Sequence, residues 1–311
     1  MSFYGIVNLK KLISQIFIIL STSSLCLAEI GVEPRSIFLL SHQPLSGLAK
    51  EYSVIGQSAH SYFKYVNDLG GVHGRSINLK IIDDQFKPNL TTKKVNEIIV
   101  KNDFFAVFSG IGGITHQSIY SLLKKKKIPS FFVGSDLPEW TKPVRANVFG
   151  FIPNANTEAS VIGKYLTKKH LGEEVIIWYA EKPVYSKAVK ALTGELYGIS
   201  VKLLAGKKGR LLAESKLIST KKPDLIVVLG NFSDQLGFLK VYKNLGIPIY
   251  TGHALADSRL TEWINRDILE HVHVLTAYPL VLETEHEGYK FHKRILNEYS
   301  PHLIPNRWTI Y

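Results

Sequence analysis

The chain has 311 residues, of which 45% are hydrophobic and 21% are charged, and its formal net charge is +12. These fractions exclude a disordered chain and a membrane protein with many spans, and the length suits two globular domains of ordinary size. The lysines are spread along the chain and no basic stripe alternates with aromatic residues, so we expect no nucleic-acid partner. The charge suits an acidic ligand or a nearby anionic membrane surface.

The N-terminus has the pattern of a secretory signal peptide. Lys10 and Lys11 precede an apolar stretch without acidic residues, and Cys26–Ala28 offers a cleavage site of the small–x–small type. We therefore expect residues 1–28 to be cleaved and the mature protein to be exported. A lipoprotein signal requires a small residue before the cysteine, and Leu25 is not small, so a lipid anchor ranks second and an uncleaved anchor third. Cleavage would remove the one cysteine, which suits an oxidising compartment.

After Arg35, apolar runs alternate with segments whose apolar residues recur at helical spacing. Gly70 and Gly71 end the first of these helices, since glycine adopts the left-handed turn at low cost. The predicted strands are 36–41, 77–83, 104–109 and 128–134, and the predicted helices are 52–68, 89–101 and 116–125.

The same alternation begins again after residue 150, where Asn156 is a candidate helix cap. The predicted helices are 156–170, 185–196, 210–220, 233–245 and 285–298, and the predicted strands are 175–180, 199–205, 224–230, 247–252 and 271–278. Strands that alternate with helices form parallel sheets covered on both faces, so we predict two α/β lobes with a break near residues 147–156. Ligands of such sheets bind beyond the carboxyl ends of the strands.

The segment VFSGIGGITHQS (107–118) places three glycines between a predicted strand and a predicted helix. A dinucleotide-binding fingerprint requires a glycine where Thr115 stands, and the chain has no Gly-Lys followed by Ser or Thr, so we do not expect a nucleotide site. Exposed backbone N–H groups at a helix N-terminus favour an anionic or carbonyl oxygen, to which Thr115 adds a hydroxyl. The alternative is that these glycines only let the strand turn into the helix.

Catalytic arrangements are missing from the sequence. There is no G-x-S-x-G elbow. His271 and His273 point to one side of a predicted strand, where a metal pair and a pair of partly buried histidines both fit. Asp83 and Asp84 are adjacent on a strand end and face opposite sides, which favours capping of backbone groups over acid–base catalysis. We expect that the protein is not an enzyme and that it has no cofactor and no metal site.

The order of several short motifs resembles the leucine/isoleucine/valine-binding type of periplasmic substrate-binding protein. The motifs are PLSG (44–47), GQSA (56–59), VNDLGGVHG (66–74), IIDDQFKP (81–88), VFSGIGG (107–113), IPSFFVGS (128–135), DLIVVLGNFSD (224–234) and GIPIYTGH (246–253). The resemblance covers about residues 36–311 and implies a type I periplasmic binding fold, in which two doubly wound parallel-sheet lobes are joined by a hinge. Lobe 1 would comprise 36–150 plus 279–311, and lobe 2 would comprise 151–278.

The resemblance also implies a function in amino acid transport. Such a protein is the periplasmic component of an ABC importer, binds a small carboxylate, amide or amino-acid-like ligand between its lobes, delivers it to a membrane permease and works as a monomer. A ligand-sensing receptor domain of the same fold is the alternative. In this family the first lobe holds the ligand's carboxylate and the second supplies an aromatic lid. By position, the predicted ligand-binding residues are Gly113, Thr115, Gly134, Ser135, Tyr185, Asn231, Phe232 and His253.

The sequence departs from the family pattern at two places. Amino-acid-binding members have a carboxylate after the strand that corresponds to IPIYTG, where this chain has His253, with Asp257 further along. Because a buried ammonium without a partner is costly, we expect a ligand without an amine, unless Asp257 pairs with it. The chain also stops at NRWTIY (306–311), where the family continues with a helix and a third hinge crossing, so a shortened, inactive product is a further alternative.

Overall fold

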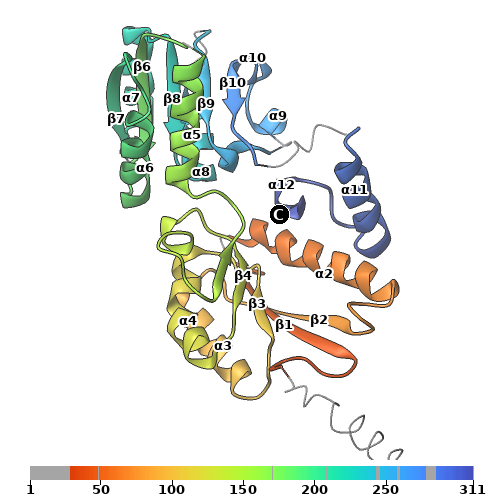
Figure 1. Cartoon of the computed structure of the whole chain (residues 1–311). Coiled ribbons are helices and arrows are strands. Elements are labelled where there is room, and N and C mark those ends of the chain that lie inside the picture. The colour runs from red at the N-terminus through yellow and green to blue at the C-terminus, as the bar shows by residue number, and fades with distance from the viewer. Residues whose placement is uncertain are drawn as a thin grey trace, which may run out of the picture.

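The structure is a computed structural model that describes residues 29–47, 49–169, 171–207, 209–242, 246–257, 260–277 and 285–310. Figure 1 shows two lobes, with β1 to β4 in the lower one and β6 to β10 in the upper one. The predicted signal peptide, residues 1–28, lies outside the described residues. Among those that are described, no helix is both long and apolar enough to cross a bilayer.

The first lobe contains a parallel five-stranded sheet with the order β2-β1-β3-β4-β5. Its strands are β1 (Ser36–Gln43), β2 (Ser76–Asp83), β3 (Ala106–Phe108), β4 (Ser130–Val133) and β5 (Val148–Gly150). Helices α3 (Pro88–Ile99) and α4 (Gly113–Lys126) pack on one face, and α2 (Ser53–Asp68) packs on the other. Neighbouring residues of β1 show the two faces, because Leu40 joins the core under α3 and α4 while Leu39 packs with Phe63 of α2.

The second lobe repeats this plan with the strand order β10-β9-β8-β6-β7, again all parallel. Its strands are β6 (Glu174–Ala180), β7 (Ser200–Gly206), β8 (Leu225–Leu229), β9 (Ile249–Thr251) and β10 (Val272–Val274). Its helices are α5 (Ala155–Lys168), α6 (Pro183–Thr193), α7 (Leu211–Lys221), α8 (Phe232–Val241), α9 (Leu260–Trp263) and α10 (Arg266–Leu269). All five residues of β8 are buried, as expected for a central strand covered by helices on both faces.

The last described helices belong to the first lobe. The chain passes from β5 to α5 through residues 151–154, and α11 (Glu287–Tyr299) and α12 (Arg307–Ile310) lie against α2 (Figure 1). Ser61 of α2 hydrogen-bonds Ser300 over 2.7 Å, and Ser58 of α2 donates to the carbonyl of Thr309 over 2.5 Å. Three short 3₁₀ helices, η1 (Lys50–Tyr52), η2 (Pro138–Trp140) and η3 (His253–Leu255), lie in loops.

The predicted fold class of two α/β lobes with parallel sheets is confirmed, and several element boundaries are corrected. Helix α5 is capped by Asn154 rather than Asn156, because the Asn154 side chain accepts from the backbone N–H groups of Asn156 and Thr157. Helix α4 begins at Gly113, three residues before the predicted start at 116, and β5 was not predicted. The strand predicted over 271–278 covers only Val272–Val274 among the described residues.

Candidate ligand-binding cleft

Loops at the carboxyl ends of both sheets line a cleft of about 540 Å³ between the lobes. The first lobe contributes the loop that leads into α4 and the loop after β4, and the second contributes the starts of α6, α8 and η3. All eight residues predicted from the resemblance line this one cleft: Gly113, Thr115, Gly134, Ser135, Tyr185, Asn231, Phe232 and His253.

The N-terminus of α4 opens into the cleft. Gly112 caps the helix with φ at 100°, a left-handed conformation that favours glycine. Its N–H donates to the carbonyl of Gly134 over 3.0 Å, and the N–H of Gly134 donates to the carbonyl of Gly110 over 2.9 Å. The N–H groups of residues 113–115 have no acceptor within the helix, so this 14-residue helix offers donors and its positive dipole end to a ligand oxygen.

Neighbouring side chains also pack closely on the glycines of this loop. A Cβ atom on Gly113 would lie 2.3 Å from Leu137 Cδ1 and 2.6 Å from Ser135 Oγ, and one on Gly112 would lie 2.7 Å from the ring of Phe86. Such distances are too short for real contacts. The glycines therefore serve the turn and the close packing around it as well as the exposure of backbone donors.

The two hydroxyl groups of this lobe differ in what they can offer a ligand. Thr115 Oγ1 lies 2.6 Å from the carbonyl oxygen of Ile111 and 2.8 Å from that of Gly112, so its hydrogen is donated within the loop. Its oxygen can only accept from a ligand. Ser135 Oγ accepts from the N–H of Leu137 over 3.1 Å, which leaves the Ser135 hydroxyl hydrogen as a donor at the cleft wall.

Tyr185 joins the two lobes. The Tyr185 side chain, at the start of α6, is buried, and its hydroxyl donates to Asp136 Oδ2 in the loop after β4 over 2.9 Å. Burial and the charge of Asp136 raise the pKa of Tyr185, so the hydroxyl stays protonated and able to donate. A more exposed contact between the lobes is the ion pair of Lys187 with Glu139 over 3.9 Å.

A buried carboxylate accompanies His253. Glu158, in the first turn of α5, accepts from both the backbone N–H and the Nδ1 atom of His253, over 2.9 and 2.5 Å. A Cβ on Gly252 would lie 2.7 Å from Glu158 Oε2, so the Glu158 carboxylate packs directly on this glycine. The sequence argument looked for a carboxylate in the loop after β9 and missed this one, because Glu158 lies 95 residues before His253 in the sequence.

Asn231 and Phe232 form the start of α8. Asn231 and Asp234 make a capping box in which the Asn231 side chain accepts from the Asp234 N–H, and Asp234 also binds Lys182 over 2.6 Å. The ring of Phe232 is buried and packs against Trp263 with centroids 5.6 Å apart. These residues shape the second-lobe wall of the cleft while they also support the lobe itself.

The rest of the wall is mostly apolar. Tyr52 and Phe86 stack with centroids 6.3 Å apart, and Ile55, Ile114, Leu137 and Val184 are further apolar residues of the wall, which also includes Lys182. Among the described residues, no group of three or more His, Cys, Asp or Glu side chains is suited to a metal ion. The cleft therefore combines donors for an oxygen, the carboxylate of Asp136 and an apolar wall.

A family model described as periplasmic binding protein matches residues 42–306. The chain belongs to the periplasmic binding protein family. This family consists of extracytoplasmic proteins that bind small-molecule ligands and work with ABC transporter permeases, rather than enzymes. None of the curated proteins matches the sequence.

Solved periplasmic binding proteins share the fold at low sequence identity. An extracellular ligand-binding receptor from Verminephrobacter eiseniae has a TM-score of 0.76 and 13% identity, over 88% of this chain and 80% of that one. A branched-chain amino acid transporter substrate-binding protein from Streptococcus pneumoniae, in complex with isoleucine, has a TM-score of 0.71 and 13% identity, again over 88% of this chain and 80% of that one. A fatty acid ABC transporter substrate-binding protein from Thermomonospora curvata has a TM-score of 0.68 and 17% identity, over 87% of this chain and 71% of that one.

Proposed function

We propose that this protein is the solute-binding component of an ABC importer, exported to the periplasm after cleavage of residues 1–28. It holds a small carboxylate-bearing molecule between its lobes and has no catalytic activity. The observation that carries the proposal is the cleft, in which the donor-rich start of α4 in one lobe faces Tyr185 and His253 of the other. The family, whose members bind small molecules for transport, supports it.

The proposed ligand has a carboxylate and an apolar body. The N–H groups at the start of α4 and the Ser135 hydroxyl suit the carboxylate oxygens, and the apolar wall suits an aliphatic or aromatic body. The names of two similar structures, one with isoleucine and one of a fatty acid transporter, describe ligands of this kind for those proteins.

An amine on the ligand is compatible with the carboxylates of the cleft. Glu158 is engaged by His253, and Asp136 lines the cleft while its carboxylate accepts from the Tyr185 hydroxyl. The expectation of a ligand without an amine came from a search for an acid near residue 253 in the sequence. Asp136 gives an ammonium a partner in the other lobe, so amino acids and simple acids are both candidates.

A ligand panel tests the proposal. Purified protein is melted with L-leucine, L-isoleucine, 4-methylpentanoate, 3-methylpentanoate, hexanoate or phenylacetate, and compounds that raise the melting temperature are titrated by calorimetry. A ligand at about one hundred times its Kd stabilises a protein by about 2.7 kcal/mol, so a true ligand gives a clear shift. Preference for leucine over 4-methylpentanoate would identify Asp136 as the ammonium partner, and Asp136→Asn should then abolish that preference.

A second candidate is a ligand-sensing domain, which the name of the Verminephrobacter eiseniae structure favours. Both functions use the same cleft, and they differ in the partner. Stimulation of ATP hydrolysis by a reconstituted importer in the presence of the liganded protein supports transport. Turnover of any panel compound, or binding of none of them, would contradict the proposed function.

A further inference from the structure

A buried polar segment packs against the loop of residues 109–113, which leads into α4 and which we call the ligand-facing loop. Strand β1 ends with Ser41, His42 and Gln43, all fully buried. Ser109, whose φ of 50° is unusual for a residue with a side chain, has its carbonyl held by Ser41 over 3.4 Å and by Gln43 over 2.6 Å. These contacts fix the loop just before the first of its glycines.

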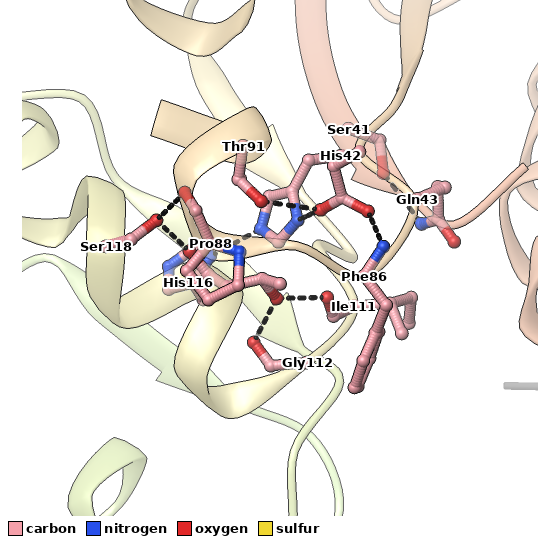
Figure 2. Close-up of polar contacts among 12 residues, drawn as sticks. Ser41, His42, Gln43, Phe86, Pro88, Thr91, Ile111, Gly112, His116 and Ser118 are labelled. Carbon is pink, nitrogen blue, oxygen red and sulfur yellow. Dashed lines mark hydrogen bonds and ion pairs between the residues drawn. The ribbon is translucent and has the colours of Figure 1, made fainter. Parts of the chain in front are cut away.

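His42 lies closest to the glycines themselves. Its carbonyl oxygen accepts from the N–H of Ile111 over 3.1 Å, and a Cβ on Gly110 would lie only 2.3 Å from its Nε2 atom. Figure 2 shows the His42 ring between Thr91 and the segment Ile111–Gly112. The position of this ring and the path of the loop therefore depend on each other.

His42 is the centre of a chain of hydrogen bonds across the first lobe. Its Nδ1 atom lies 2.9 Å from Asp84 Oδ2, and its Nε2 atom lies 3.0 Å from His116 Nδ1. His116 Nε2 lies 3.0 Å from Ser130 Oγ. All four residues are 0% exposed. His116 is the fourth residue of α4. These hydrogen bonds therefore connect the start of that helix to β1 and β4.

Asp84 fixes the direction of this chain. Its Oδ1 accepts from the N–H of Phe86 over 2.9 Å, and its Oδ2 lies 3.0 Å from the hydroxyl of Thr91 (Figure 2). An ionised carboxylate can only accept, so His42 carries a proton on Nδ1. With both rings neutral, His42 Nε2 accepts from His116 Nδ1–H, and His116 Nε2 accepts from the Ser130 hydroxyl. Every donor in the chain then has an acceptor.

Protonation of the histidines disrupts this pairing of donors with acceptors. One added proton makes His42 Nε2 a donor, which reverses both following bonds and takes away the acceptor of the Ser130 hydroxyl hydrogen. A second added proton places two N–H groups against each other across 3.0 Å. Buried polar groups without partners are costly, and no water-exposed side of either ring is present to compensate.

A nearby positive charge favours the neutral form of the His116 ring. Arg145, in the loop before β5, lies over the rings of Tyr120 and Trp140, and Trp140 packs edge-on against His116 with centroids 4.9 Å apart. Burial, His42 and the positive charge of Arg145 lower the pKa of His116 well below its usual value. Asp84 is the acidic group that faces the pair, and Tyr120 is the other titratable side chain nearby.

We propose that His42 and His116 are positioning residues that hold the ligand-facing loop, residues 109–113, in its binding conformation only while both imidazoles are neutral. Acidification protonates the pair, releases the loop and the start of α4, and so weakens ligand binding. The proposal rests on the proposed function in one respect, the assignment of this loop to the ligand. Its test needs no ligand, so the failure of either proposal is a separate result.

Nuclear magnetic resonance of the ¹⁵N-labelled protein provides the test. At about pH 8, the imidazole nitrogens of both residues should report neutral rings protonated on Nδ1. As the pH is lowered, the backbone amide signals of Gly110, Gly112 and Gly113 should shift with the same midpoint as the His116 ring. The proposal is wrong if either ring carries its proton on Nε2, if the loop signals stay fixed while the rings titrate, or if neither ring titrates before the protein unfolds.

Substitutions separate positioning from packing. In His116→Asn, the amide replaces Nδ1–H as the donor to His42 and can turn to accept from a protonated His42. The amide signals of the loop should keep their neutral-pH positions, and the change in their chemical shifts on acidification should be at least about fivefold smaller than in wild type. In His116→Phe, which keeps a ring without nitrogens, the loop signals should be displaced at every pH. His60→Asn, on the exposed side of α2, is the control and should change neither signal set. A full pH response of the loop in His116→Asn would overturn the proposal.

Discussion

At the scale of single residues, Tyr185 is the clearest link between the lobes. Its ring lines the cleft and its hydroxyl donates to Asp136 of the other lobe over 2.9 Å. A hydrogen bond to a charged group contributes about 1.5–3 kcal/mol. Because this bond joins the lobes, its energy contributes to closure around a ligand more than to the folding of either lobe.

Tyr185→Phe should therefore weaken ligand binding while the protein stays folded. The ring and its packing remain, and only the bond to Asp136 is lost, so we expect a loss of about tenfold in affinity for the panel compound that binds best. Calorimetry measures the affinity, and circular dichroism should give an unchanged melting curve without ligand. Tyr197→Phe, at a site where the side chain is 72% exposed, is the matched control. Equal affinities of the Tyr185 variant and wild type would contradict this role.

At the scale of elements, the contact of α11 and α12 with α2 contains a half-buried histidine. His292 of α11 hydrogen-bonds Thr309 of α12 over 2.9 Å, and burial lowers the pKa of His292 from 6.5 to about 4. The folded protein thus binds this proton less tightly than the unfolded chain does. The contribution of neutral His292 to the free energy of unfolding is therefore complete above about pH 6.5 and is lost as the pH falls from 6.5 towards 4.

His292→Gln should reduce this acid sensitivity. The Gln amide can reach Thr309 but does not titrate, so the melting temperature should fall less between about pH 6.5 and pH 4.5 than in wild type. A difference of a few degrees is expected, since about 1 kcal/mol shifts the melting temperature of a protein of this size by roughly 2–4 °C. His302→Gln, at an exposed site in the same lobe, should behave like wild type. Parallel curves for the wild type and the His292 variant would exclude the effect.

The elements also show what the sequence could predict. Apolar periodicity predicted the alternation of strands and helices because parallel strands covered on both faces, such as β8, are apolar along their whole length. It could not predict that β1 continues into buried polar residues, since His42 and Gln43 look like a solvated loop until their partners from other segments are known. Glu158 was missed for the same reason, because its partner His253 is distant in sequence.

At the scale of the whole molecule, the cleft depends on how two separate lobes meet. Each lobe has its own core, and the described contacts between them near the cleft include polar ones: Tyr185 with Asp136, the N–H of Ala155 with the carbonyl of Asp136, and Lys187 with Glu139. Interfaces of this kind permit relative motion of domains. A ligand that contacts both lobes adds the interactions that the lobes lack by themselves, so closure and binding should be coupled.

Cross-linking the lobes at the rim of the cleft should trap a bound ligand. Cys26, the one cysteine of the sequence, lies in the predicted signal peptide, so a double variant of Glu139→Cys and Lys187→Cys carries a unique pair in the mature protein. The charged atoms at the ends of these two side chains are 3.9 Å apart, so a reducible linker about as long as the two side chains together can join the cysteines. We expect the bound panel compound to dissociate at least about tenfold more slowly after linking and at the original rate after reduction, because opening of the lobes is the route of release. Stopped-flow measurement of dissociation gives both rates, and each single-cysteine variant serves as a control. A dissociation rate that linking does not change would mean that ligand leaves without separation of the lobes, and the clamshell mechanism would then be wrong for this protein.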